Sequence, residues 1–166
     1  MVLFRHWKIA ALATAFAGGG WMLSCFGAQP TDHDVGYDLS RTVRFETGAK
    51  QMHNGDDITI TDVHGTSDTM TAGNIYVIRG TYRLASEKKA TLAAFVTESA
   101  SDPDLKQMQE IPVQRTQTLA LDEGNGKFKL VLYLWYNGNP HVSFYPAGGG
   151  NSFGGVYFGT GASVLK

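Results

Sequence analysis

Large apolar residues alternate with polar ones along most of the chain after residue 56, which is the pattern of β-strands that bury one face. The clearest run is 127–136, where one parity is apolar throughout and consists of Phe128, Leu130, Leu132, Leu134 and Tyr136. The opposite parity changes from charged to aromatic and reads Lys127, Lys129, Val131, Tyr133 and Trp135. The pattern predicts a strand that packs its Leu132 face into the core and turns its Tyr133 face outward.

Similar alternation predicts six more strands, at 57–63, 74–84, 90–97, 116–122, 141–145 and 153–159, and a short edge strand near 42–46. Glycine and asparagine predict tight turns at Glu123–Gly126 and Asn137–Pro140, and a glycine-rich turn at Ala147–Ser152. The one helical candidate, near Pro103, is short and lies in the connection 98–114. We therefore expect an all-β, antiparallel β-sandwich of about seven or eight strands. Its strand order is similar to that of immunoglobulin-like domains, although their Cys-Trp-Cys pattern is missing.

The first 28 residues have the build of a secretory signal peptide. Arg5 and Lys8 form a basic start, residues 9–23 carry no charge, and small residues lead to Ala28. Cleavage after Gly27 is acceptable, whereas cleavage after Ala28 places a bulky phenylalanine three positions before the cut. A cut after Ala17 has better small residues but leaves a short apolar region.

A second interpretation of the same segment is a lipoprotein signal, in which Cys25 becomes the lipidated first residue. The leucine of Met22-Leu23-Ser24-Cys25 lies one position too late for the usual pattern. A retained membrane span is disfavoured, because the uncharged stretch is shorter than the ~20 residues that cross a bilayer. We expect a signal peptide at 1–28, a polar tether at 29–44 and one domain at 45–166, secreted or periplasmic, with a membrane-anchored lipoprotein as the alternative.

Composition narrows the classes of function. Removing residues 1–28 lowers the basic residues from 14 to 12 against 15 acidic ones, which changes the net charge from −1 to −3. No stripe of lysine and arginine is visible, so we expect no nucleic-acid partner. Cleavage after Cys25 would also remove the only cysteine, and with it thiol catalysis, disulfides and cysteine-based zinc sites.

Motifs with catalytic or metal-binding chemistry are weak. Gly150–Gly154 matches G-x-S-x-G around Ser152, but a β-rich segment follows it and no histidine occurs after His141. The run Gly148-Gly149-Gly150 lacks the Lys-Ser/Thr of a phosphate-binding loop. The acidic clusters Asp32-His33-Asp34 and Asp56-Asp57-Asp62-His64 lack metal-ligand spacing. We therefore expect no cofactor, no metal and no enzymatic activity.

Four aromatic residues form the strongest candidate surface. Tyr133 and Trp135 share the outer face of one predicted strand, and His141 and Tyr145 share that of the next, across the predicted turn at 137–139. Exposed rings on a rigid sheet can hold sugar rings or a protein partner. The alternative is that the N-terminal segment, the 98–114 connection or a second sheet covers them, since cross-strand aromatic pairs also stabilise sheets.

Two segments carry a resemblance to a family: Gly73–Leu84 with Ala90-Thr91-Leu92, and the C-terminal His141–Pro146 with Ser152–Gly161. Over about 45–166 the chain resembles a group of uncharacterised small secreted bacterial proteins. The resemblance implies export and a single domain, and it implies no activity. We expect a non-enzymatic module that binds an unknown protein or glycan at the cell envelope. The alternative is an exported hydrolase-like enzyme with an unrecognised site.

Overall fold

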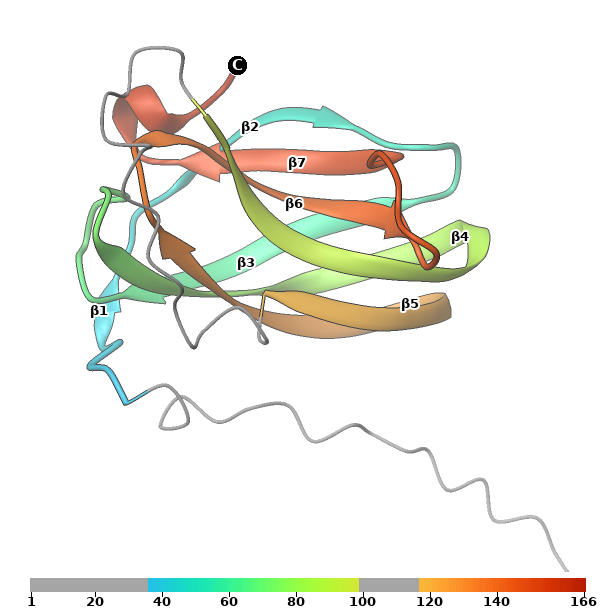
Figure 1. The fold of residues 1–166 in the computed structure, drawn as a ribbon, viewed down its shortest axis with the longest axis horizontal. Coiled ribbons are helices and arrows are strands. Elements are labelled where there is room, and N and C mark those ends of the chain that lie inside the picture. The colour runs from blue at the N-terminus through green and yellow to red at the C-terminus, as the bar shows by residue number, and fades with distance from the viewer. Residues whose placement is uncertain (1–35, 99–116) are drawn as a thin grey trace, which may run out of the picture.

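The computed structural model describes residues 36–98 and 117–166 (Figure 1). The described residues form seven strands: β1 (Arg41–Thr42), β2 (Glu46–Gln51), β3 (Asp57–Gly65), β4 (Asn74–Glu98), β5 (Thr118–Leu134), β6 (Gly138–Pro146) and β7 (Gly154–Gly159). One 3₁₀ turn, Gly161–Ser163, follows β7. The expected all-β class is confirmed. No helix in the described ranges is long and apolar enough to cross a membrane. The predicted signal peptide and residues 99–114 of the predicted connection, with its helical candidate, lie outside the described residues.

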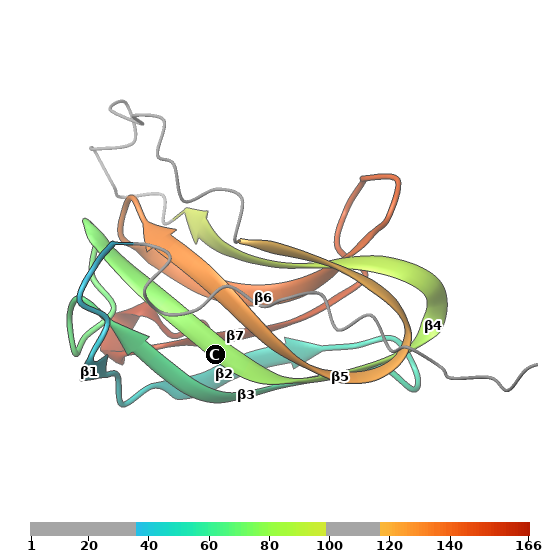
Figure 2. The same cartoon turned by 90° about the horizontal axis from the view of Figure 1, so that it is seen from below.

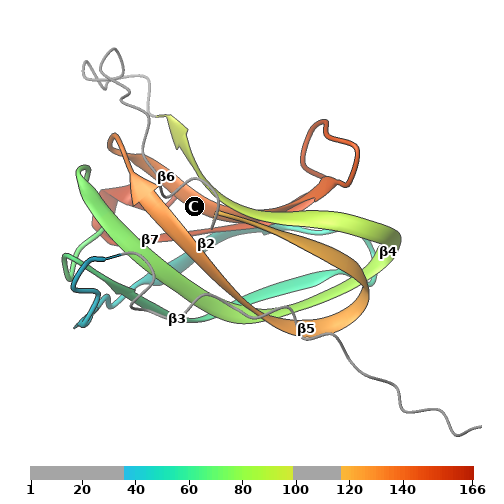
Figure 3. The same cartoon turned by 60° about the horizontal axis from the view of Figure 1, so that its bottom comes forward.

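All seven strands belong to one antiparallel sheet with the order β1-β3-β4-β6-β7-β2, and β5 pairs with the other edge of β4. The sheet curls over on itself into a half-barrel (Figures 2 and 3). Its first half contains β1, β3, residues 74–84 of β4 and residues 124–134 of β5. Its second half contains β2, β7, β6, residues 89–98 of β4 and residues 118–122 of β5. One continuous sheet therefore takes the place of the two separate sheets that we expected.

The two halves are continuous because β4 and β5 bend together. Leu84 pairs with Gly124 and Lys89 with Asp122, so the four residues 85–88 bulge out of β4 opposite a single residue of β5. The predicted turn at 123–126 is wrong, since these residues lie inside β5. Likewise, 74–84 and 90–97 are one strand, as are 118–122 and 127–134. Gly124 allows β5 to bend and does not reverse the chain direction. It adopts a φ of 133° that L-residues rarely tolerate.

A buried carboxylate holds the bend of β4. The Asp56 side chain, 6% exposed, accepts hydrogen bonds from the backbone N–H groups of Ala85 (2.8 Å) and Ser86 (2.9 Å) and from the Ser86 hydroxyl (2.6 Å). Burial acts to raise the pKa of Asp56, but these three hydrogen bonds, with a smaller effect of His53, outweigh it and lower the pKa below its usual range. The ionised carboxylate thus caps backbone groups that have no strand partner at the bulge.

The inner face of the curled sheet forms the main core. The predicted inward parity of 127–134 is confirmed, since Phe128, Leu130, Leu132 and Leu134 are all buried. Tyr136 lies just after β5 and donates a hydrogen bond from its hydroxyl to the Val96 carbonyl (3.0 Å). Leu39 and Val43, which fall in the predicted tether, are also buried, so the packed domain includes them.

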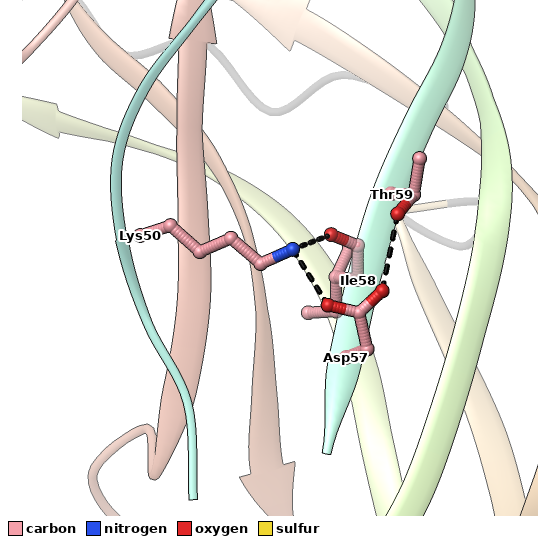
Figure 4. A network of polar contacts seen from close by, with 4 residues as sticks. All are labelled: Lys50, Asp57, Ile58 and Thr59. Carbon is pink, nitrogen blue, oxygen red and sulfur yellow. Dashed lines mark hydrogen bonds and ion pairs between the residues drawn. The ribbon is translucent and has the colours of Figure 1, made fainter. Parts of the chain in front are cut away.

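A lysine joins the two halves on the side away from β5. The Lys50 ammonium on β2 reaches across to β3, where it pairs with the Asp57 carboxylate (2.6 Å) and donates to the Ile58 carbonyl (2.9 Å) (Figure 4). Thr59 donates to the second Asp57 oxygen (3.1 Å). Side chains, rather than a backbone ladder, therefore link β2 to β3.

The predicted hairpin between 127–136 and 141–145 is wrong. β6 begins at Gly138 and pairs with Glu98 of β4, whereas β5 ends at Leu134 beside Asn74. Residues 135–137 therefore pass from the first half to the second. The turn-forming sequence is present, but β5 and β6 do not pair with each other. Both strands pair with β4 instead, β5 along one edge and β6 along the other.

Candidate binding surface

The structure separates the four predicted surface residues into two pairs. Tyr133 and Trp135 stack edge to face with ring centroids 4.6 Å apart at the end of β5. His141 and Tyr145 lie on β6, in the other half of the sheet. The predicted single surface across a hairpin is therefore not formed, because β5 and β6 do not pair.

The outer face of the first half is covered by the chain itself. Val131, of the predicted outward parity, is only 1% exposed and packs with Ile75, Val77 and Leu39, and Tyr133 is partly buried against this group. Leu39 belongs to the segment before β1, so this part of the N-terminal segment covers the face here. The outer face of the first half is thus a second, small core.

The outer face of the second half has a different character. Phe95 of β4, His141 and Tyr145 of β6 and Tyr157 of β7 lie close together, and we call these four residues the β6 aromatic cluster. Ring centroids are 5.7 Å apart for Phe95–Tyr145, 6.4 Å for Phe95–His141 and 5.2 Å for His141–Tyr157. Phe95 is 38% exposed. The sequence contains Phe95 and Tyr157 at the outward parity of their strands, but their proximity to His141 depends on a strand pairing that the sequence did not indicate.

Small residues lie beneath these rings. Thr91 pairs with Tyr145, Ala93 with Ser143 and Phe95 with His141, so the rings of Phe95 and Tyr145 meet above the Ala93–Ser143 pair. Ala93 and Ser143 are consequently 1% and 4% exposed although they are on the outer face. The four-ring cluster is therefore packed and preorganised, and its outer atoms are what a partner would contact.

A serine and a histidine are linked within the cluster. The Ser143 hydroxyl lies 2.8 Å from Nδ1 of His141. Burial alone lowers the pKa of His141, which favours a neutral ring at pH 7. Burial also raises the pKa of Tyr145, helped by the nearby Tyr157 and opposed by Ser143. The surface thus presents neutral hydrogen-bonding groups beside apolar ring faces.

A groove of about 430 Å³ adjoins the cluster on the side of β7 and β2. Its lining includes His141, Ser143 and Tyr157 from the cluster and the neighbouring Gly154-Gly155. The remaining lining residues come from β2 (Ala49, Lys50 and Gln51), from the chain after it (His53) and from the turn before β7 (Ser152 and Phe153). His53 and Phe153 lie against each other with ring centroids 5.3 Å apart.

Further hollows are found elsewhere on the described surface. One, of about 1400 Å³, follows the bend of β5 and is lined by side chains of mixed charge, such as Arg83, Asp122 and Lys127. Another, of about 420 Å³, lies between Phe95 and the Tyr133–Trp135 pair.

The structure shows the surroundings of the weak catalytic and metal-binding motifs found in the sequence. Ser152 lies in the turn between β6 and β7, so G-x-S-x-G has a strand-turn-strand context instead of the strand-turn-helix of a nucleophile elbow. Asp62 pairs with Arg79 (2.8 Å) and with His64 (3.0 Å), while Asp56 and Asp57 have the separate partners described above. Within 36–98 and 117–166, no group of three or more His, Cys, Asp or Glu side chains could hold a metal ion. The Asp32-His33-Asp34 cluster lies outside these ranges.

Comparison with known proteins gives no relative for the chain. No protein-family model, no curated protein and no solved structure matches it.

Proposed function

We propose that the chain is an exported, non-enzymatic binding module whose β6 aromatic cluster contacts a glycan or a protein partner at the cell envelope. The observation that carries the proposal is the gathering of four rings on the outside of a hydrogen-bonded sheet. A fold that needed only its inner core would place polar residues there, as it does at Thr59 and Thr61 of β3. Rigid aromatic side chains lose little entropy on binding and are frequent at recognition sites.

The export signal and the tether are parts of this proposal that rest on the sequence. Mass spectrometry of the mature N-terminus tests the first of them. A polypeptide beginning after Gly27 supports a free exported module, whereas a diacylglyceryl group on Cys25 supports the lipid-anchored alternative. An uncleaved chain would contradict export by this signal.

A glycan array read with wild-type protein and two variants tests the binding role. Phe95→Ala removes an exposed ring from the β6 aromatic cluster, and Trp135→Ala removes a partly buried ring from the separate pair at the end of β5. We expect glycan binding that Phe95→Ala weakens and Trp135→Ala leaves nearly unchanged. Equal binding by both variants and wild type would contradict a role for the cluster.

One observation favours the hydrolase alternative: the 2.8 Å contact between Ser143 and His141 is the geometry of a nucleophile and its base. Two observations oppose it. Ser143 is only 4% exposed, and within the described residues no carboxylate forms an ion pair with His141 to orient the ring. A fluorophosphonate probe that labels wild type but not Ser143→Ala would establish the enzyme, and absence of labelling supports the binding role.

A further inference from the structure

We infer that the groove beside the β6 aromatic cluster is a subsite for a neutral, polyhydroxylated ligand, namely one or two sugar units of a glycan. This inference rests on the proposed binding function and names the ligand class and the place where it binds. Four features of the groove carry it: a floor that holds Ser143 against His141, hydrogen-bonding groups with free capacity, aromatic rings in the lining, and the absence of available charge.

A glycine stands opposite the buried serine at the floor of the groove. Gly155 of β7 pairs with Ser143 of β6, and a Cβ at position 155 would collide with the Ser143 hydroxyl. Any larger residue would therefore displace Ser143 from His141. The glycine makes room for the Ser143 hydroxyl, which in turn contacts Nδ1 of His141 and fixes the ring that lines the groove.

His141 has one ring nitrogen available for a ligand. Its Nδ1 is taken by Ser143, and in the described part of the chain no buried side-chain nitrogen or oxygen lacks a partner, so Nε2 faces accessible space. If Ser143 donates to Nδ1, the neutral ring carries its proton on Nε2 and becomes a donor toward the groove. The amide of Gln51 and the hydroxyl of Ser152 add neutral donors and acceptors to the same lining.

Aromatic rings line the groove on either side of Gly155. Tyr157 follows Gly155 by two residues and contacts His141. Phe153 precedes it by two residues, contacts His53 and stacks on Phe144 of the main core, which fixes its ring in place. Sugars present apolar C–H faces and hydroxyl edges, which match a site that combines ring faces with neutral polar groups. The volume of about 430 Å³ falls in the range of about 300–1,000 Å³ typical of small-molecule sites.

The charge of the lining argues against ionic ligands. Lys50 is the only lysine or arginine among the lining residues, and aspartate and glutamate do not occur there. Its ammonium is engaged by the Asp57 carboxylate at 2.6 Å and the Ile58 carbonyl at 2.9 Å (Figure 4). A phosphate, sulfate or carboxylate would therefore lose its hydration without gaining a counter-charge.

The test uses the mature chain and a panel of neutral glucose, mannose and N-acetylglucosamine trisaccharides, with sialylated and sulfated glycans as the charged arm. Ser152→Trp places a bulky ring at the groove, and Asn151→Trp places the same ring on the next exposed position of the turn, which does not line the groove. Calorimetry measures affinity, and circular dichroism confirms that both variants are folded.

We expect a neutral trisaccharide to bind, Ser152→Trp and His141→Ala to weaken it by roughly tenfold or more, and Asn151→Trp to leave it unchanged. If Phe95→Ala weakens glycan binding but Ser152→Trp does not, the groove is not the subsite. The proposed function would remain intact in that case. Binding of charged glycans alone, or of no glycan, would overturn the ligand class. A protein partner lost in Phe95→Ala would then still support the proposed function.

Discussion

The outer faces of the two halves of the sheet are both rich in apolar side chains, yet they differ in what covers them. In the first half, Leu39 packs over Ile75, Val77 and Val131, and the face is a closed secondary core. In the second half, the rings of the β6 aromatic cluster cover only the small residues Ala93 and Ser143 and remain partly exposed themselves. The difference teaches that apolar residues at outward positions of a strand can form either a closed layer or a partly exposed face, depending on whether a neighbouring segment covers them.

The largest loss of stability is expected for a substitution on the inner face, which both halves share. Leu132→Asp should abolish soluble, folded protein, because an unpaired carboxylate would enter the main core at a site that is 1% exposed. The exposed Lys127→Asp on the same strand should fold normally and serves as the control. A cooperative melt of Leu132→Asp in circular dichroism would contradict the inward parity of β5.

The comparison between the outer faces predicts that truncating a side chain lowers the free energy of unfolding more in the first half than in the second. Val131→Ala should lower the free energy of unfolding by about 1.5–3 kcal/mol, since it removes methyl groups from the closed layer. Phe95→Ala should cost less than about 1.5 kcal/mol, because its ring remains partly in water. Urea denaturation measures both, and equal or reversed costs would break the distinction between a closed and an open face.

Asp56 holds the bend between the two halves, so we expect its contribution to stability to depend on pH. The effect should be of intermediate size. Asp56→Asn should lower stability at pH 7 by about 1–3 kcal/mol, because it weakens the cap on Ala85 and Ser86. The pKa of Asp56 is lowered in the folded state, so its contribution is present above the unfolded value of about 3.9 and is lost as the pH falls through the folded value.

The difference in stability between wild type and Asp56→Asn should therefore shrink below about pH 5. Thermal melts at a series of pH values between neutrality and strong acid measure it. A difference that stays constant or grows on acidification would show that Asp56 does not act as a carboxylate at the bend.

The smallest effect is expected at the link between β2 and β3. Lys50→Met should lower stability by less than about 1 kcal/mol, because Lys50 and Asp57 are both more than a third exposed and solvent screens the pair. The pKa of Asp57 is lowered, with the Lys50 hydrogen bond as the largest cause, so NMR titration of Asp57 should show its pKa rise in the variant. A loss of several kcal/mol would mean that the link stabilises the half-barrel far more than an exposed ion pair can.

Local patterns in the sequence were sufficient for the strand class and for the inward face of 127–134. They were insufficient for strand partnership. Gly124 and Gly126 have the residue types of a turn, but the continued pairing of β5 with β4 places them inside a strand. The same long-range pairing joins Phe95 and Tyr157 to His141 and removes Tyr133 and Trp135 from it. His141 and Tyr145 could be selected from the sequence as outward aromatics, whereas the placement of the buried Ser143 opposite Gly155 depends on the register between β6 and β7.

Hydroxyl-radical footprinting of the purified protein, read by mass spectrometry, tests most directly whether the second outer face is open. The account predicts that Phe95 is oxidised readily, whereas the fully buried Phe144 on the inner face of the same half is protected. It also predicts that removing the residues up to position 40 increases oxidation near Val131 and leaves that of Phe95 unchanged. Protection of Phe95 to the level of Phe144 would contradict an open outer face.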